Sequence, residues 1–187
     1  MADAADMGGR RRLAPFIVVP VLVVVGLFVA VLATREPAVN RTTDSPLLGR
    51  QAPDFAGPTL AGGEFALTTE RGRFVLVNFF ATWCVPCQIE HPELRAFHER
   101  HAPIGDAEVV SIVFDDETAD VRAYFEQNGG DWPVVVGDLD SIALDYGVTG
   151  IPESFLIGPD GTVVFKITGG VTDEGLEDLL RQAQGIP

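Results

Sequence analysis

The sequence contains two cysteines, Cys84 and Cys87, and they stand three positions apart. Two cysteines are too few for a disulfide scaffold, and a structural zinc site takes four ligands. The stretch 74–80 before them is short and apolar apart from one asparagine, which is typical of a buried strand, and a helical pattern follows. A CxxC pair at a strand-to-helix junction is typical of a redox centre, so we predict a catalytic thiol pair.

The chemistry of thiol–disulfide exchange gives the two cysteines different roles. Cys84 is expected at the N-terminus of a helix over 85–101, where free backbone N–H groups and the helix dipole stabilise an anion. Such positions lower the pKa of a cysteine below its free value of about 8.5, and the thiolate is the attacking species. Cys87, one turn deeper, is expected to be more buried and to act as the resolving thiol. The alternative is an inert disulfide, but so short a loop would contribute little stability by chain entropy.

The elements around the pair alternate between strand and helix patterns. After the strand at 74–80 and the helix at 85–101, the periodicity predicts strands at 109–114, 134–136, 153–157 and 162–167, and helices at 118–127, 141–146 and from the cap Thr172-Asp173 to about 184. The turn sequence at 158–161 joins the last two strands as a hairpin. This order predicts an α/β fold with a central mixed sheet flanked by helices.

The N-terminal part of the sequence predicts one transmembrane helix before this domain. Residues 13–33 carry no charge, and at about 1.5 Å per residue a helix of that length crosses the bilayer core. Arginines at 10–12 precede it, which favours a cytoplasmic N-terminus and an exported remainder. A signal peptide cleaved near Ala33 is the alternative, although the apolar run exceeds the usual length of such peptides. Either interpretation exports the rest of the chain.

We therefore expect a single-pass protein of the cell membrane with an extracytoplasmic C-terminal domain. The expected parts are a cytoplasmic N-terminus 1–12, a transmembrane anchor or signal peptide 13–34, a linker 35–46 and a folded domain 47–187. The linker contains the triplet Asn40-Arg41-Thr42, which fits a glycosylation sequon but occurs often by chance. The net charge of −14 argues against a nucleic-acid partner.

Three segments and one helix proline resemble the thioredoxin superfamily, and most closely its membrane-anchored group of ResA, TlpA and CcmG/DsbE proteins. Gly49–Phe55 resembles the segment that opens this group and the peroxiredoxins, and 77–84 resembles the strand that enters the active site. Pro92 matches a helix proline of thioredoxins, and 147–157 resembles the loop that carries a cis-proline. The resemblance covers about 47–184 and implies a thioredoxin-like fold and protein-disulfide oxidoreductase activity.

The resemblance also implies a role for Glu90. Thioredoxin has a buried aspartate where this chain has Asn78, and the anchored group combines an asparagine there with a glutamate three residues after its second cysteine. That spacing places Glu90 on the same side of the helix as Cys87. A carboxylate buried there should have a raised pKa and could carry the proton of the resolving thiol. The alternative is an ordinary solvated glutamate.

Substrate contacts are expected around the same site. The resemblance implies a cis peptide at Ile151-Pro152 that faces the cysteines and offers free backbone groups to an extended substrate. Glu153 matches a glutamate of CcmG-like proteins and would form an acidic patch with Glu90, or it is simply a surface charge. Trp83 is expected to pack beside Cys84 and to form part of the docking surface.

The resulting hypothesis is a reductant of disulfides in exported proteins such as apocytochrome c, re-reduced by a membrane electron carrier of the CcdA or DsbD type. A disulfide-forming oxidant is the alternative, because sequence does not set the reduction potential. A thiol peroxidase shares the opening segment, but its active-site pattern is missing before Cys84. Copper chaperones of this fold use CxxxC and a distant histidine. We expect no cofactor and no metal, and the helix histidines 91, 98 and 101 are expected to be solvated.

Overall fold

The computed structural model describes residues 14–33, 39–137 and 139–186, and it divides the chain into two compact units, 1–37 and 38–187. In the first unit, α1 (Ala14–Ala33) is helical, and its side chains are described over 18–30. Across the described residues, no helix is found that is both long enough and apolar enough to cross a membrane. The anchor over 13–34 therefore stays a prediction, and the arginines at 10–12 lie outside the described residues.

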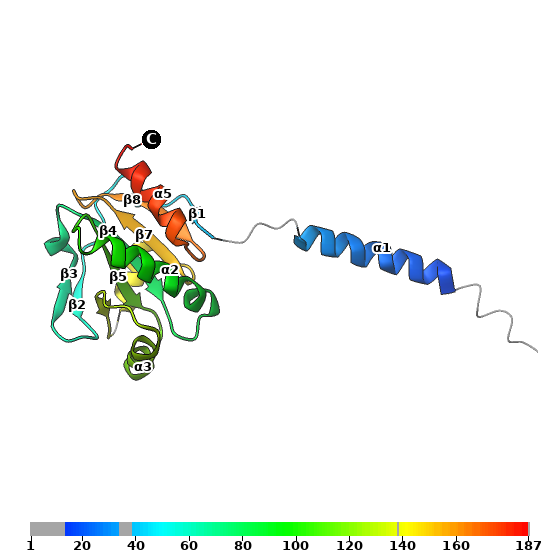
Figure 1. Ribbon diagram of the computed structural model, residues 1–187, viewed down its shortest axis with the longest axis horizontal. Coiled ribbons are helices and arrows are strands. Elements are labelled where there is room, and N and C mark those ends of the chain that lie inside the picture. Colours follow the sequence, from blue (N-terminus) through cyan, green and yellow to red (C-terminus); the bar gives the residue numbers. More distant parts are fainter. Residues whose placement is uncertain (1–13, 34–38, 138, 187) are drawn as a thin grey trace, which may run out of the picture. The chain divides into compact units, whose positions relative to one another are not determined.

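The second unit is built on a six-stranded mixed sheet in the order β1-β8-β7-β4-β5-β6 (Figure 1). The strands are β1 (Arg41–Thr42), β4 (Phe74–Phe80), β5 (Ala107–Val113), β6 (Val134–Val135), β7 (Glu153–Ile157) and β8 (Val163–Thr168). β4, β5 and β6 are parallel, whereas β7 runs antiparallel to both β4 and β8. Every residue of β4 and β5 is buried, which explains their continuous apolar sequences.

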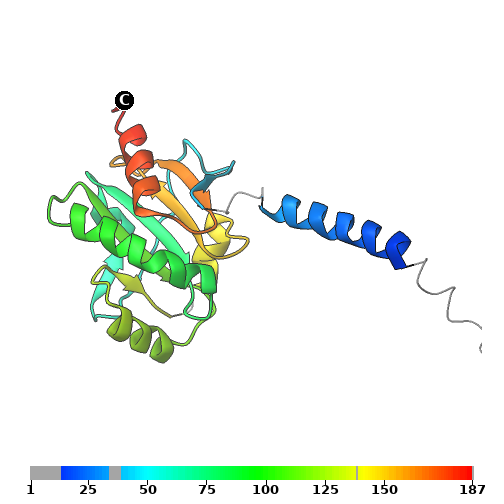
Figure 2. The same cartoon turned by 45° about the vertical axis from the view of Figure 1, so that its right-hand side comes forward.

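The α-helices that cover this sheet lie where the sequence predicts them, whereas the 3-10 turn in the same unit was not predicted. They are α2 (Val85–His101), α3 (Thr118–Asn128), α4 (Asp140–Tyr146), α5 (Asp173–Ala183) and a 3-10 turn η1 (Leu67–Glu70). α2 and α5 lie side by side over one face of the sheet (Figures 1 and 2). Thr172 caps α5, because its Oγ1 accepts the Gly175 N–H at 3.2 Å. The mixed α/β architecture predicted from the sequence is confirmed.

A short hairpin that the sequence analysis did not identify covers one edge of the sheet. Its strands are β2 (Ala56–Pro58) and β3 (Glu64–Ala66). The Leu60 N–H donates to the Val134 carbonyl at 2.8 Å, and the Val136 N–H donates to the Pro58 carbonyl at 3.0 Å. The hairpin thereby satisfies backbone groups of the edge strand β6, which would otherwise be open to another chain.

The opposite edge is formed by residues that the sequence analysis assigns to the linker. β1 pairs antiparallel with β8, with Arg41 opposite Thr168, and the folded unit begins at Ala38 rather than near Leu47. Two residues are too few to show a strand period in a sequence. The amide of Asn40 is engaged in this contact, since its Nδ2 donates to Thr172 Oγ1 at 2.7 Å. One N–H of this side-chain amide is therefore engaged within the folded unit.

The contact between Asn40, just before β1, and the start of α5 predicts an unusual effect of Gly175→Ala. Alanine in place of glycine normally stabilises a helix by up to about 1 kcal/mol. Here an added Cβ would lie 2.1 Å from Asn40 Nδ2, so Asn40 must move and lose its hydrogen bonds with Thr172. We expect the free energy of unfolding of the full chain to fall by about 1 kcal/mol in urea titrations.

The matched control for this effect is the same change in an Asn40→Gly background. In that background the side chain of Asn40 is absent, so Gly175→Ala should raise the free energy of unfolding. If Gly175→Ala stabilises the chain that still carries Asn40, the packing described between Asn40 and the start of α5 is incorrect.

Candidate active site

The two cysteines lie where β4 passes into α2, as predicted. Cys84 is the N-cap of α2, with extended backbone, and its Sγ accepts the Cys87 N–H at 3.3 Å. Pro86 occupies the first helical turn, where its missing N–H breaks no helix hydrogen bond. The two sulfurs form a disulfide, with 5.2 Å between the Cα atoms, so the chain is in its oxidised state. The exposed fractions are 5% for Cys84 and 3% for Cys87, so the predicted difference in burial is small.

The loop after β5 holds the turn that precedes Cys84. The Trp83 Nε1–H donates to the Asp115 carbonyl at 2.9 Å, and the Thr82 N–H donates to Asp116 Oδ2 at 2.5 Å. Trp83 is nevertheless 58% exposed. Val85 and Ile89 on the first turns of α2 are also exposed. Together they form an apolar surface next to the redox pair, in the place where the sequence analysis expects substrate docking.

Glu90 is buried, with 1% of its surface exposed, so the alternative of a solvated glutamate is wrong. Its Oε1 accepts a hydrogen bond from Asn78 Nδ2 at 2.9 Å, and its Oε2 accepts one from the Val171 N–H at 3.1 Å. Burial raises the pKa of this carboxyl to about 8, although both hydrogen bonds pull the pKa down. An acid with this pKa, one helical turn after Cys87, can gain and lose a proton near neutral pH.

Asn78 is held in turn by the strand beside it. It stands opposite Ser154 in the β4–β7 ladder, and its Nδ2 also donates to Ser154 Oγ at 3.1 Å. Asn78 is buried on β4 and cannot itself exchange a proton. It therefore fixes one oxygen of the Glu90 carboxyl without competing for the proton, which agrees with the sequence interpretation of this asparagine.

The peptide bond between Ile151 and Pro152 is cis, as the resemblance implies. The register pairs Glu153 with Phe79, so Pro152 lies at the same end of the sheet as the cysteines. Its carbonyl accepts the Gly169 N–H at 3.0 Å, which ties this loop to the segment that follows β8. Pro152 is buried and Ile151 is half-buried, so the loop offers a limited surface beside the redox pair.

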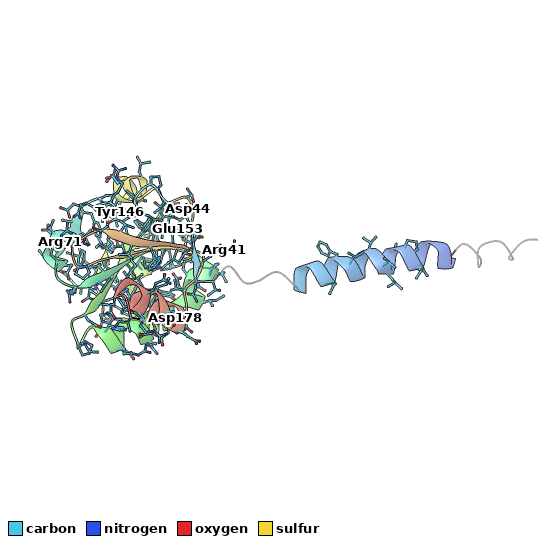
Figure 3. The ribbon with its side chains drawn as sticks, turned by 90° about the horizontal axis from the view of Figure 1, so that it is seen from above. Arg41, Asp44, Arg71, Tyr146, Glu153 and Asp178 are labelled. Carbon is cyan, nitrogen blue, oxygen red and sulfur yellow. A yellow bond between two sulfur atoms is a disulfide. The ribbon has the colours of Figure 1, made fainter. Side chains whose placement is uncertain are left out.

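Glu153 is labelled in Figure 3, where it lies within the folded unit. It is neither a surface charge nor part of an open acidic patch, because 4% of it is exposed and a cation lies beside it. Its Oε2 lies 2.9 Å from Lys166 Nζ, and its Oε1 accepts the Thr149 Oγ1–H at 2.8 Å. Lys166 also donates to the Gly147 carbonyl at 3.1 Å. The ion pair therefore fixes the loop that carries Pro152. The sequence analysis did not identify Lys166, whose position on β8 carries no local signal.

The three histidines of α2 are buried, so the expectation of solvated side chains is wrong. His91 bonds the Gly129 carbonyl at 2.9 Å and packs on Trp132, and burial lowers its pKa. His98 lies 3.4 Å from Glu108, and this interaction raises its pKa. His101 bridges the carboxylates of Asp106 and Glu177. Each histidine has a packing or pairing role, and the described residues contain no cluster of three or more side chains suited to a metal.

Comparison with known proteins agrees with this geometry. Residues 48–166 match the AhpC/TSA family. The chain is similar to the thiol–disulfide oxidoreductase ResA of Bacillus thuringiensis (34% identity, 72% of this chain and 78% of ResA). It is also similar to the thiol:disulfide interchange protein CycY of Rhizobium leguminosarum (36% identity, 63% of each chain).

Solved structures agree as well. A structure from Chlorobium tepidum, titled as a thiol:disulfide interchange protein DsbE, aligns with a TM-score of 0.67 and 30% identity over 73% of this chain and 96% of that one. A second thioredoxin-family interchange protein of the same organism aligns with the same TM-score and 28% identity over 75% and 99% of the two chains. The family match covers more than half of the sequence, and the Cys84–Cys87 pair stands at the start of α2. The chain therefore belongs to the AhpC/TSA family, with a thioredoxin-like fold, as a thiol–disulfide oxidoreductase.

Proposed function

We propose that this oxidoreductase works outside the cytoplasm, tethered to the cell membrane, and reduces disulfides in exported proteins such as apocytochrome c. The observation that carries the proposal is the buried Glu90 carboxyl one turn after Cys87. The names of the similar ResA, CycY and DsbE proteins support the reaction type. The uncharged run 13–33 and its arginine flank support the tether and the compartment.

The reaction begins from the reduced pair. The Cys84 thiolate attacks one sulfur of the substrate disulfide, which forms a mixed disulfide and releases the other substrate sulfur as a thiolate that takes up a proton. The N-terminus of α2 stabilises the attacking thiolate. The exposed Trp83 and the loop at Pro152 are the surfaces that a substrate chain would contact at this stage.

The second step resolves the mixed disulfide. Cys87 loses its proton to Glu90 and attacks Cys84 Sγ, which releases the second substrate thiolate and leaves the Cys84–Cys87 disulfide seen in the structure. The substrate gains two electrons and the enzyme loses two. A membrane dithiol carrier of the CcdA or DsbD class would return those electrons and regenerate both thiols.

Removal of the Glu90 proton acceptor should slow the second step. We expect Glu90→Gln to leave the attack by Cys84 nearly unchanged and to slow resolution by about 100-fold or more, so that the mixed disulfide accumulates. Acid quenching and mass spectrometry of the reaction with a disulfide-bonded apocytochrome c would measure both steps. Glu99→Gln, an exposed change on the same helix, is the matched control. Resolution at the parent rate in Glu90→Gln would exclude the proton role.

The buried carboxyl should also make stability depend on pH in a predictable direction. The pKa of Glu90 is raised from 4.5 to about 8 on folding, so the folded chain holds this proton more tightly than the unfolded chain. Its contribution is therefore complete below about pH 4.5 and is lost as the pH rises to about 8. As the pH rises between these values, the free energy of unfolding of the oxidised parent chain should fall relative to that of oxidised Glu90→Gln. We expect this relative change to be on the order of 2–4 kcal/mol. Urea unfolding of both proteins at a series of pH values tests this. The same dependence of the free energy of unfolding on pH in the parent and the variant would contradict it.

The direction of electron flow separates the proposal from its alternative, a disulfide-forming oxidant. A reductant should have a reduction potential near that of thioredoxin, about −270 mV, or lower. We expect this range for the Cys84–Cys87 pair in the full chain, equilibrated in dithiothreitol buffers. A value near that of DsbA, about −120 mV, would instead establish an oxidant. Peroxide consumption in the same preparation tests the thiol peroxidase alternative.

A further inference from the structure

The segment 169–172, between β8 and α5, contacts both parts of the active site. The Gly169 N–H donates to the Pro152 carbonyl at 3.0 Å, and the Val171 N–H donates to Glu90 Oε2 at 3.1 Å. Val171 therefore supplies the one backbone donor that the described residues direct at the Glu90 carboxyl. The orientation of this peptide, together with the hydrogen bond from Asn78, sets how well the charged form of Glu90 is stabilised.

The sequence of this segment does not hold that orientation by itself. Gly169 has φ of +81°, and both Gly169 and Gly170 lack the side chain that would restrict the backbone. Gly170 lies close to the site, because a Cβ added there would be in ordinary van der Waals contact with the carboxyl of Glu90 and the Pro86 carbonyl, each at 3.9 Å. A peptide that follows two glycines needs contacts from elsewhere in the fold to keep one direction.

Asn40 supplies those contacts from the other end of the folded unit. Its backbone N–H donates to the Gly170 carbonyl at 2.9 Å, and its Nδ2 donates to Thr172 Oγ1 at 2.7 Å. Its Oδ1 accepts the Thr172 N–H at 2.8 Å. These three hydrogen bonds hold Gly170 and Thr172, the residues on both sides of Val171. Asn40 has φ of +52°, a left-handed conformation that asparagine tolerates better than most residues.

We propose that Asn40 is a positioning residue for Glu90, which it serves by holding the Val171 N–H against the Glu90 carboxyl. The inference rests on the proposed function for the role of Glu90, whereas the hydrogen bonds from Asn40 to Gly170 and Thr172 are a property of the fold. It gives the first residues of the folded unit, which the sequence analysis assigned to the linker, a part in the chemistry. Asn40 touches neither substrate nor sulfur and acts only through the segment 170–172.

The other groups around Glu90 come from three elements. Asn78 of β4 donates to Oε1, and Cys87 precedes it by one turn on α2. Tyr124 of α3 has a pKa raised first by its burial and then by the charge of Glu90. None of these groups contacts Asn40 through a hydrogen bond in the described structure, so the hydrogen-bonded connection from Asn40 to Glu90 runs through the segment 170–172.

The test is the titration of the Glu90 carboxyl carbon by NMR in the oxidised full chain in detergent, with the signal assigned by its loss in Glu90→Gln. Asn40→Gly keeps the left-handed backbone and its N–H but removes both side-chain bonds. We expect the midpoint to rise by about half a pH unit to one unit, because the Val171 N–H is then held less firmly against the charged carboxyl. Thr172→Val should shift it similarly, and the double variant should shift it no further. Thr172→Ser keeps the hydroxyl and should restore the parent midpoint.

A control separates positioning from mere stability. Leu180→Val weakens the buried face of α5 without touching Asn40 or Thr172, and it should leave the Glu90 midpoint unchanged. The inference is overturned if Asn40→Gly titrates like the parent chain, or if Leu180→Val moves the midpoint equally. A parent midpoint near 4.5 would instead refute the proton role in the proposed function. Whether Asn40 positions the Val171 N–H would still be tested by the effect of Asn40→Gly on that midpoint.

Discussion

The structure of this site depends on one buried carboxyl, that of Glu90, held by two hydrogen-bond donors. A carboxylate removed from water costs several kcal/mol unless it is protonated or well paired. Asn78 and Val171 supply enough stabilisation to keep Glu90 in place but not enough to offset burial, and so the pKa rises towards neutrality. β4, α2 and the β8–α5 connection must all stand in register for this balance to exist.

A second carboxylate at the same end of the sheet has the opposite environment. Glu153 is as thoroughly buried, but Lys166 lies 2.9 Å away and Thr149 donates to its other oxygen. Among the described residues, no cation stands in the same relation to Glu90. The surroundings therefore suit two buried glutamates to different tasks: Glu153 holds the Pro152 loop, and Glu90 exchanges protons in the proposed function.

The far half of α2 keeps this arrangement rigid. Arg100 pairs with Asp173 at 2.6 Å, and Glu93 accepts the Asp173 N–H at 2.9 Å. His101 reaches Glu177 at 2.8 Å. These contacts fix the start of α5 against the helix that carries Cys87 and Glu90. The segment between β8 and α5 is thereby held at both ends, by β8 and by α2, and Asn40 acts on the residues between.

The sequence by itself determined the strand β4, the helix α2, the redox pair between them and the cis-proline loop. Each of these has a signal within a few residues of sequence. The signals are a run of apolar residues for β4, a two-residue gap between the cysteines, and an X-Pro bond in a segment that resembles thioredoxins. The position of Glu90 relative to Cys87 follows in the same way from helix geometry.

Only the tertiary structure decided what surrounds those residues. The Val171 N–H, the Lys166 partner of Glu153 and the grip of Asn40 come from segments far apart in the chain. Histidines that look solvated in the sequence are buried for the same reason. The sequence does not distinguish a titratable side chain that faces water from one that faces a buried partner. Its pKa depends on that environment, which only the fold determines.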